Sequence, residues 1–528
     1  MPPRYEPVEV WERRPGAATA PLGGYRRREP EQTLLHQVVR GRLEPFLASV
    51  RERSATGRGL PSHVVRDLRA YLDCGILGRG FARIRCPDCG FERLVAFSCK
   101  ARSCPSCNAR RMEDAAEHLV HDVFPRVPVR QWVLSFPRRL RFLAARDPAF
   151  CSRLLDLFTR AVFAWQRRRG RLAGVADPRT GGCTAVQRFG SAINLNVHFH
   201  TLIPDGVFDL ARPGRALFVP LPAPSDQELE RILTRIIRKV ARHIARGREV
   251  ERAVEEDAFA ELQAAEVDRR MRFPDPFKHA RHSVALDGFS LHAGVRIHEH
   301  DRAGLEQLCR YAVRPPFALH RLSQGPDGKL LYKMKRARSG ALFLLLTPDQ
   351  LLARVATLVP PPRTHALRYH GVFAPNSKDR SRVVPGGATA PPAAAEGHQR
   401  QRGQDGVSGQ AALRAPAPEG PPAASAAAAR FTLAAAIDPP GDDRCAPRYR
   451  VPWAELLRKV FSLDVLSCPQ CGGRMELLAF IAEAGVAKRI LDHLGLASTG
   501  PPLARAAAPE EAADPGPEYD GADPSYDD

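Results

Sequence analysis

Residues 86–107 read CPDCGFERLVAFSCKARSCPSC and hold two Cys-Pro-x-Cys pairs, Cys86/Cys89 and Cys104/Cys107. Each pair places two thiolates on one tight turn, and the glycine after the first pair permits the backbone turn that such a site needs. Together the pairs supply the four thiolates of a tetrahedral Zn²⁺ site, whereas the alternative is a set of isolated buried thiols. Four thiolates leave no ligand position open, so we expect this zinc to be structural.

Two further cysteines, Cys74 and Cys99, lie close to these pairs in the sequence. They could be ligands of a second ion, alternative ligands of the first, or small buried apolar residues, and from the sequence we favour the last of these. The N-terminal residues do not form a signal peptide, and the sequence has no apolar run long enough to span a membrane. We therefore expect a cytoplasmic protein whose 12 cysteines stay reduced and bind metal where they cluster.

A third Cys-Pro-x-Cys element lies near the C-terminus, in the sequence CPQCGG. Its cysteines, Cys468 and Cys471, make only half of a zinc site. Either another ligand completes the site, the nearest candidates in sequence being Cys445 and His493, or the turn holds no metal.

The charge is strongly positive, with 79 Lys and Arg against 58 Asp and Glu and a sequence pI near 10.0. Such an excess usually means a polyanionic partner, most often nucleic acid, although a solvated Arg-rich surface is the alternative. Basic residues also surround the paired cysteines, which suits a module that contacts DNA phosphates. They are Arg83, Arg85, Lys100, Arg102, Arg110 and Arg111.

A chain of 528 residues is too long for one hydrophobic core. Helical and alternating apolar patterns predict an α+β protein, and a stretch rich in Ala, Pro and Gly predicts a linker. The expected parts are a disordered N-terminus at 1–30, a helical zinc-binding domain at 31–112, a mixed catalytic core at 113–380, a disordered linker at 381–444, a small C-terminal helical and zinc-ribbon-like CPxCGG element at 445–497, and an acidic disordered tail at 498–528.

The run LNVHFHTLIPDGV, residues 195–207, has the alternation of a β-strand. Because strand side chains alternate between faces, His198 and His200 share one face and Phe199 takes the other. Two imidazoles roughly 7 Å apart along a strand can converge on one metal ion. The alternative is that they are polar partners on a solvated face of a sheet.

Downstream, the helical run GLEQLCRYAVRPP carries Tyr311, with Arg310 and Arg314 beside it. A phenol is a poor nucleophile in isolation, but it becomes adequate opposite a metal-polarised phosphodiester. Its attack would leave a phosphotyrosyl bond and a free 3′-hydroxyl. A lone helical tyrosine is more often a core or interface residue, so this interpretation depends on the other motifs.

Six stretches in one order resemble the insertion-sequence-91 family of transposases, including its insertion-sequence common-region relatives. They are FARIRCPDCGFERLVAFSCKARSCPSC, VPVRQWVLSFPRRLRF, QRFGSAINLNVHFHTLIPDGVF, GLEQLCRYAVRPP, RYHGVFAPNSKDR and DVLSCPQCGGRMELLAFI.

This resemblance implies an HUH-type endonuclease core, in which helices flank a central antiparallel sheet. It implies rolling-circle-type transposition in the bacterial cytoplasm, at the nucleoid, with DNA as partner, mainly single-stranded or hairpin element ends. His198 and His200 would bind a catalytic Mg²⁺ or Mn²⁺, and Tyr311 would attack the strand and hold its 5′ end. Neither a membrane partner nor an oligomeric state is predicted.

The family's founding members have a second tyrosine four residues after the first, where this chain has Pro315. The chain therefore resembles the single-tyrosine branch. HUH enzymes generally add a Glu, Gln or His as third metal ligand, and Gln187 and Glu306 are the candidates here. Two alternatives to a transposase remain open: a rolling-circle plasmid replication initiator with the same chemistry, and a zinc-containing DNA-binding protein without activity.

Overall fold

The computed structural model describes residues 29–54, 56–211, 213–246, 258–268, 281–325, 327–338, 341–385, 452–461 and 464–503. Two compact units divide the chain, and the second of them, Thr389–Arg448, lies wholly outside these residues, as does most of the expected linker. The expected loose N-terminus and acidic tail also lie outside them, apart from residues 29–30 and 498–503. Among the helices of the described part, none is both long and apolar enough to cross a membrane.

A six-stranded antiparallel sheet forms the centre of the first unit, in the order β14-β5-β6-β3-β10-β9. Its middle strands β3 and β6 are buried over most of their length, and the burial includes polar residues such as Arg130 and His200. The central antiparallel sheet expected from the sequence is therefore confirmed. The strands are β3 (Val129–Ser135), β5 (Gly181–Phe189), β6 (Leu195–Pro204), β9 (Ser283–Leu286), β10 (Phe289–Ile297) and β14 (Leu367–Gly371).

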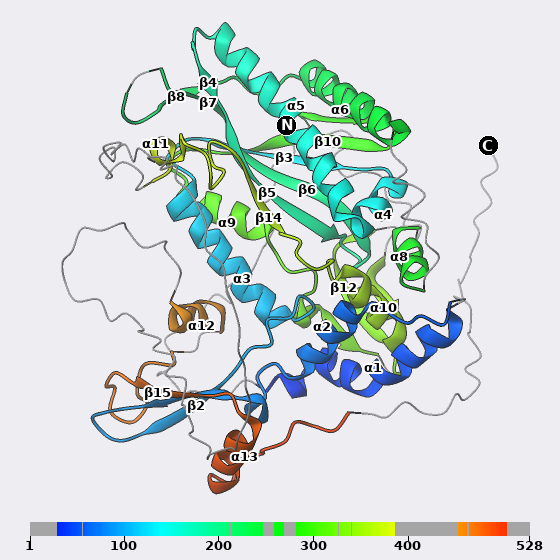
Figure 1. Cartoon of the computed structure of the whole chain (residues 1–528), viewed down its shortest axis with the longest axis vertical. Coiled ribbons are helices and arrows are strands. Elements are labelled where there is room, and N and C mark those ends of the chain that lie inside the picture. The colour runs from blue at the N-terminus through cyan, green and yellow to red at the C-terminus, as the bar shows by residue number, and fades with distance from the viewer. Residues whose placement is uncertain are drawn as a thin grey trace, which may run out of the picture. The chain divides into compact units, whose positions relative to one another are not determined.

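Helices cover both faces of this sheet (Figure 1). On one face Phe199 of β6 packs against Phe158 of α5, with ring centroids 6.4 Å apart, and α6 lies beside α5 and covers β9 and β10. On the other face Leu202 of β6 packs in one cluster with Leu305 of α9 and the end of α3. The alternation of β6 therefore sends Phe199 and the two histidines to opposite faces, as the sequence predicted. The helices are α3 (Pro105–His118), which continues as a π-helical turn (Leu119–Val123), α5 (Pro148–Leu172), α6 (Asp226–Arg246) and α9 (Arg302–Ala312).

Two smaller three-stranded sheets and further helices complete the core. Helix α11 lies at the point where the linker was expected to begin, so the folded core continues slightly beyond residue 380. The smaller sheets contain β4 (Pro178–Arg179), β7 (Gly206–Asp209) and β8 (Leu217–Pro220), and β11 (Leu322–Gln324), β12 (Leu330–Arg338) and β13 (Ala341–Leu346). The helices are α4 (Arg138–Arg146), α8 (Ala258–Asp268), α10 (Pro348–Leu358) and α11 (Arg380–Val383).

The N-terminal cysteine-rich module is built on the β1–β2 hairpin, and the C-terminal strand β15 adds to it. Strand β15 pairs antiparallel with β1, from Phe81 opposite Ile481 to Arg85 opposite Glu476. Residues from both ends of the chain thus form one three-stranded sheet. The elements are α1 (Leu34–Arg53), α2 (Ser62–Leu72), β1 (Phe81–Arg85), β2 (Glu92–Ala96), α12 (Trp453–Phe461), β15 (Glu476–Ile481) and α13 (Ala484–His493).

The packing of this module joins the same two parts of the chain. Ile84 of β1 is buried in one cluster with Leu457 of α12 and Met475, and Phe81 packs with Ala487 and Leu491 of α13. The C-terminal element was expected as a part of its own at 445–497. In the structure its described residues instead share a sheet and a core with the N-terminal module.

Candidate metal centres and active site

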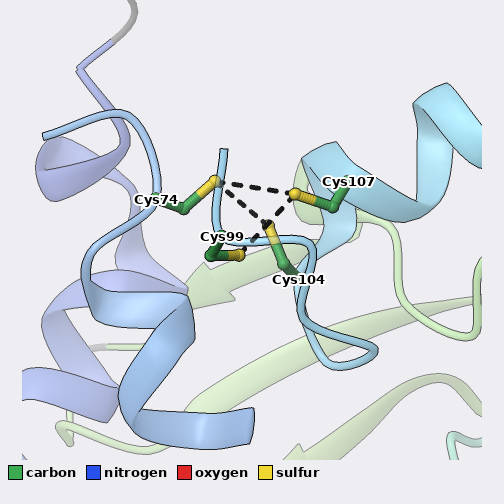
Figure 2. A group of neighbouring side chains, drawn as sticks. All are labelled: Cys74, Cys99, Cys104 and Cys107. Atoms are coloured by element: carbon green, nitrogen blue, oxygen red, sulfur yellow. Dashed lines mark hydrogen bonds between the residues drawn. The ribbon is translucent and has the colours of Figure 1, made fainter. Parts of the chain in front are cut away.

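Four cysteines converge where the chain enters and leaves the β1–β2 hairpin. The sulfur of Cys74 lies 3.5 Å from that of Cys104 and 3.8 Å from that of Cys107, and the sulfur of Cys99 lies 3.6 Å from that of Cys107 (Figure 2). All four Sγ atoms lie within 4.8 Å of one another, and three of the four side chains are buried. Sulfurs that bind one zinc tetrahedrally at 2.3 Å lie about 3.8 Å apart, so the group fits a Zn²⁺ ion.

A second group of four cysteines joins the two ends of the chain: Cys86, Cys89, Cys468 and Cys471. The sulfur of Cys86 lies 3.5 Å from that of Cys471, and the sulfur of Cys89 lies 3.5 Å from that of Cys468. These four Sγ atoms also lie within 4.8 Å of one another, so this group too could hold one metal ion.

The two Cys-Pro-x-Cys turns of this second group share a backbone hydrogen bond and a glycine conformation. Gly90 donates its N–H to Cys86 O at 3.0 Å, and Gly472 donates to Cys468 O, also at 3.0 Å. Both glycines have positive φ, 75° and 74°, which glycine adopts without steric cost. The prediction that the glycine after the first cysteine pair permits the turn is thus confirmed. Gly472 has the same conformation in the C-terminal turn.

The single site expected from Cys86, Cys89, Cys104 and Cys107 is wrong in its grouping, because the structure divides these residues between two groups. The physical reason is the hairpin. The first pair lies in its turn, whereas Cys104 follows its second strand, and a strand of five residues spans roughly 17 Å. The thiols that complete each site therefore come from elsewhere in the chain.

Those additional thiols correct two further expectations. Cys74 and Cys99, which we favoured as small apolar residues, precede and follow the hairpin and belong to the first group. Cys468 and Cys471 are completed by the hairpin turn. His493, the end of α13, does not belong to that group, and Cys445 lies outside the described residues.

The two histidines of β6 lie side by side on one face of the central sheet. Their ring centroids are 4.9 Å apart. Nδ1 of His198 donates to the carbonyl oxygen of Asn196 at 2.9 Å, and Nδ1 of His200 lies 3.1 Å from the side-chain amide of Gln131. Nδ1 of His198 is a donor, so its Nε2 carries the lone pair that can bind a ligand. Nε2 of His200 does the same in the tautomer whose Nδ1–H is accepted by the amide oxygen of Gln131.

Burial controls the protonation of this pair. It lowers the pKa of His198 to about 4, and it holds the pKa of His200 well below its usual value, with His198 and Arg314 adding to the effect. Both rings are therefore neutral at pH 7, which is the form of imidazole that binds metal.

Tyr311 reaches the histidine pair from helix α9. Its ring lies edge-on to that of His200, with centroids 5.3 Å apart, and the guanidinium of Arg314 lies 5.4 Å from the tyrosine ring. The helix begins where Asp301 accepts the N–H of Gly304 at 2.7 Å, and a proline pair follows its end. The histidine pair and Tyr311, which belong to two separate sequence motifs, thus meet at one point.

Gln187 of β5 connects this helix to the sheet. It lies opposite His198 in the strand register, and its Nε2 donates to the backbone oxygens of Tyr311 and Ala312 at 3.0 and 2.7 Å. Its Oε1 is buried and, within the described part of the chain, accepts no hydrogen bond. An unpartnered carbonyl oxygen on the residue paired with His198 has the chemistry of a third metal ligand.

Glu306, the other candidate for third ligand, has different partners. Its carboxylate pairs with Arg310 at 2.5 Å, and Arg310 also pairs with Glu113 of α3 at 2.7 Å. Glu306 therefore contributes to the contact between α9 and α3, and the geometry favours Gln187.

Two family models match the chain. One, described as "Putative transposase", matches residues 181–381, which include both histidines and Tyr311. The other, described as the transposase zinc-binding domain of insertion sequence 91, matches residues 44–136. The chain belongs to the insertion-sequence-91 family of transposases. No match was found among curated proteins or among solved structures.

As a member of this family, the transposase binds DNA, cuts and joins it, and carries structural zinc. The matched zinc-binding region contains Cys74, Cys99 and the two pairs of the quoted stretch, but it ends long before Cys468. The completion of the second cysteine group by the C-terminus therefore comes from the structure alone.

Proposed function

We propose that this transposase nicks and rejoins single-stranded DNA at the ends of its element through a covalent 5′-phosphotyrosine, with Tyr311 as nucleophile, in rolling-circle-type transposition. The observation that carries the proposal is the approach of Tyr311 to His200, edge-on at 5.3 Å, on an antiparallel sheet flanked by helices. This arrangement supports an HUH-type core.

In the proposed reaction the phenolic oxygen of Tyr311 attacks the scissile phosphorus. The P–O3′ bond breaks, the tyrosine loses its proton to solvent, and the departing 3′-oxygen takes up a proton to become a hydroxyl. The new phosphotyrosyl bond retains the energy of the phosphodiester, so the reverse step can join the 5′ end to another 3′-hydroxyl. Arg314 beside the ring favours the negative charge that develops on the phenol and the phosphate.

His198, His200 and Gln187 are the residues that would hold the catalytic divalent metal. Two neutral imidazoles favour Mn²⁺ over Mg²⁺, and the buried, unpartnered Oε1 of Gln187 is an oxygen ligand that suits either ion. When bound, the metal supplies Lewis-acid stabilisation of charge on the phosphate oxygens.

The two cysteine groups would each hold one structural Zn²⁺. Each provides four thiolates and leaves no position for water or substrate, so neither suits catalysis. We assign to them the folding of the module that precedes the catalytic core and its docking on DNA.

Covalent capture tests the proposed function. The full chain is mixed with Mn²⁺ and a labelled single-stranded oligonucleotide from the element's own end, and a denaturant-resistant adduct is expected. If the chain binds the oligonucleotide but forms no adduct, the alternative of a zinc-containing DNA-binding protein without activity is favoured. A hairpin-forming element end beside the gene is expected for a transposase, whereas plasmid replication functions around the gene would favour a replication initiator.

The role of Gln187 gives a prediction of its own. Gln187→Ala is expected to raise the Mn²⁺ concentration for half-maximal adduct formation by about 10–100-fold, since both a ligand and a positioning contact are lost. Gln166→Ala is the matched control. Its Nε2 also donates to two backbone oxygens, those of Pro204 and Gly206, and its Oε1 is likewise buried without a partner among described residues, but it lies on α5. An unchanged Mn²⁺ requirement in Gln187→Ala, or an equal change in both variants, would remove Gln187 from the metal site.

A further inference from the structure

A small cavity lies at the edge of the central sheet where β5 meets the segment before β14. Its volume is about 70 Å³. About 10–15 Å³ of such volume holds one water molecule, so the cavity has room for a phosphate-sized group. Its lining includes Arg102, Cys151, Val186, Arg188, His365 and Arg368.

Arg188 gives this cavity its chemistry. Its Nη1 donates to the carbonyl oxygen of Ala145 at 3.1 Å, whereas its Nε and Nη2 are buried and have no hydrogen-bond partner in the described residues. Nε and Nη2 share one edge of the guanidinium, and that edge matches two oxygens of a phosphate. Burial lowers the pKa of Arg188 to about 10, so the side chain is still cationic at pH 7.

The other charged side chains that line the cavity have the same sign. Arg368 donates to Ser152 Oγ at 2.7 Å, and Arg102 comes from the loop between Cys99 and Cys104. Of the described residues that line the cavity, none has a carboxylate. The nearby Asp147 instead accepts the N–H groups of Ala149 and Phe150 at the start of α5. A buried, unpartnered donor edge among like charges suits an anion.

We propose that this cavity binds one phosphate group of the DNA strand, at a site separate from the scissile phosphate. The cavity is lined by Val186, which pairs with Phe199, and by Cys151 of α5, which shares a core cluster with Phe199. Tyr311 instead packs against His200, whose side chain takes the opposite face of β6, so the cavity and Tyr311 lie on different faces of the sheet. Arg102 belongs to the cysteine-rich module and Arg188 to the core. One phosphate bound in the cavity would therefore contact both parts of the protein. The choice of DNA as its source rests on the DNA binding that the family implies.

Phosphate binding is tested on the full chain without divalent metal or cleavage. Inorganic phosphate is titrated against chloride at equal ionic strength, and the thermal unfolding midpoint is followed. We expect the midpoint to rise in the wild type, with an apparent affinity at least about tenfold weaker in Arg188→Lys, which keeps the charge but loses the paired donors. Arg368→Gln is a second variant, in case Arg188→Lys folds poorly, and it too is expected to weaken the response.

Arg160→Lys on α5 is the matched control, since Arg160 is exposed and pairs with Asp156. It should respond to phosphate as the wild type does. No phosphate response in the wild type, or equal responses in the wild type and in both cavity variants, would overturn the site.

A competition experiment identifies the source of the phosphate. Bound inorganic phosphate is followed by ³¹P line width while a single-stranded oligonucleotide is added, and displacement is expected. Binding of the oligonucleotide without displacement would show a site for free phosphate and contradict the DNA assignment. Since neither experiment needs cleavage, a failure of the Tyr311 chemistry is distinguishable from a failure of this site.

Discussion

Tyr311→Phe is expected to abolish the covalent protein–DNA adduct, with a loss of at least about a thousandfold, because no other atom replaces the attacking oxygen. The measurement is denaturing electrophoresis of the full chain with Mn²⁺ and a labelled single-stranded oligonucleotide from the element's end. Oligonucleotide binding before cleavage should change little. The substitution removes one oxygen and keeps the ring that packs edge-on against His200.

Tyr332→Phe is the matched control for this prediction. Tyr332 of β12 is buried and, like Tyr311, interacts electrostatically with Arg314. Its phenol is not near the histidines by any contact in the described residues, so its removal should leave the adduct intact. An adduct that persists in Tyr311→Phe, or disappears in Tyr332→Phe, would show that the nucleophile is assigned wrongly.

Local periodicity predicted much of the catalytic core. The alternation around Phe199 correctly placed His198 and His200 on one face, because a strand allows only two directions for a side chain. The helix that carries Tyr311 was also correctly expected, since a proline pair ends it. What periodicity could not give was the helix's position over the sheet, which depends on tertiary contacts such as the bonds from Gln187 to the backbone of Tyr311 and Ala312.

The cysteines show the same limit more sharply. The Cys-Pro-x-Cys spacing predicts that two thiolates share a turn, but it says nothing of which turns share an ion. Nearness in sequence suggested that Cys89 and Cys104 belong together, whereas β15 pairs with β1 and brings Cys471 to the hairpin turn instead. The only signal for this arrangement was the repetition of the CPxC element at both ends of the chain.

The second cysteine group has consequences beyond its own module, because helix α3 contacts both α12 and α9. Lys459 of α12 forms an ion pair with Glu117 of α3, and Glu113 on the same helix pairs with Arg310, the residue before Tyr311. The position of the tyrosine helix thus depends in part on a helix that the C-terminal element holds. Loss of zinc from the second group is therefore expected to weaken catalysis indirectly, after the module has loosened.

Zinc content is the most direct measurement of the two sites. The wild type is expected to bind two zinc ions per chain, and Cys468→Ser with Cys471→Ser should reduce this to one. Structural zinc contributes about 10–16 kcal/mol to folding in zinc-finger peptides, so the loss should detach the C-terminal element. Limited proteolysis should then cleave residues 452–503 much faster than in the wild type. Cys183→Ala, at a buried cysteine outside both groups, should keep both ions.

Pairs of substitutions then decide which cysteines share an ion. Cys89 and Cys471 belong to one group, so the double variant Cys89→Ser with Cys471→Ser should lose the same single zinc as either variant alone. Cys89→Ser combined with Cys107→Ser should lose both ions, because these two residues belong to different groups. The grouping expected from sequence order reverses both results, since it places Cys89 and Cys107 on one ion and Cys471 on another. Loss of only one zinc in Cys89→Ser with Cys107→Ser would therefore restore that grouping and refute the arrangement in which both ends of the chain bind one zinc.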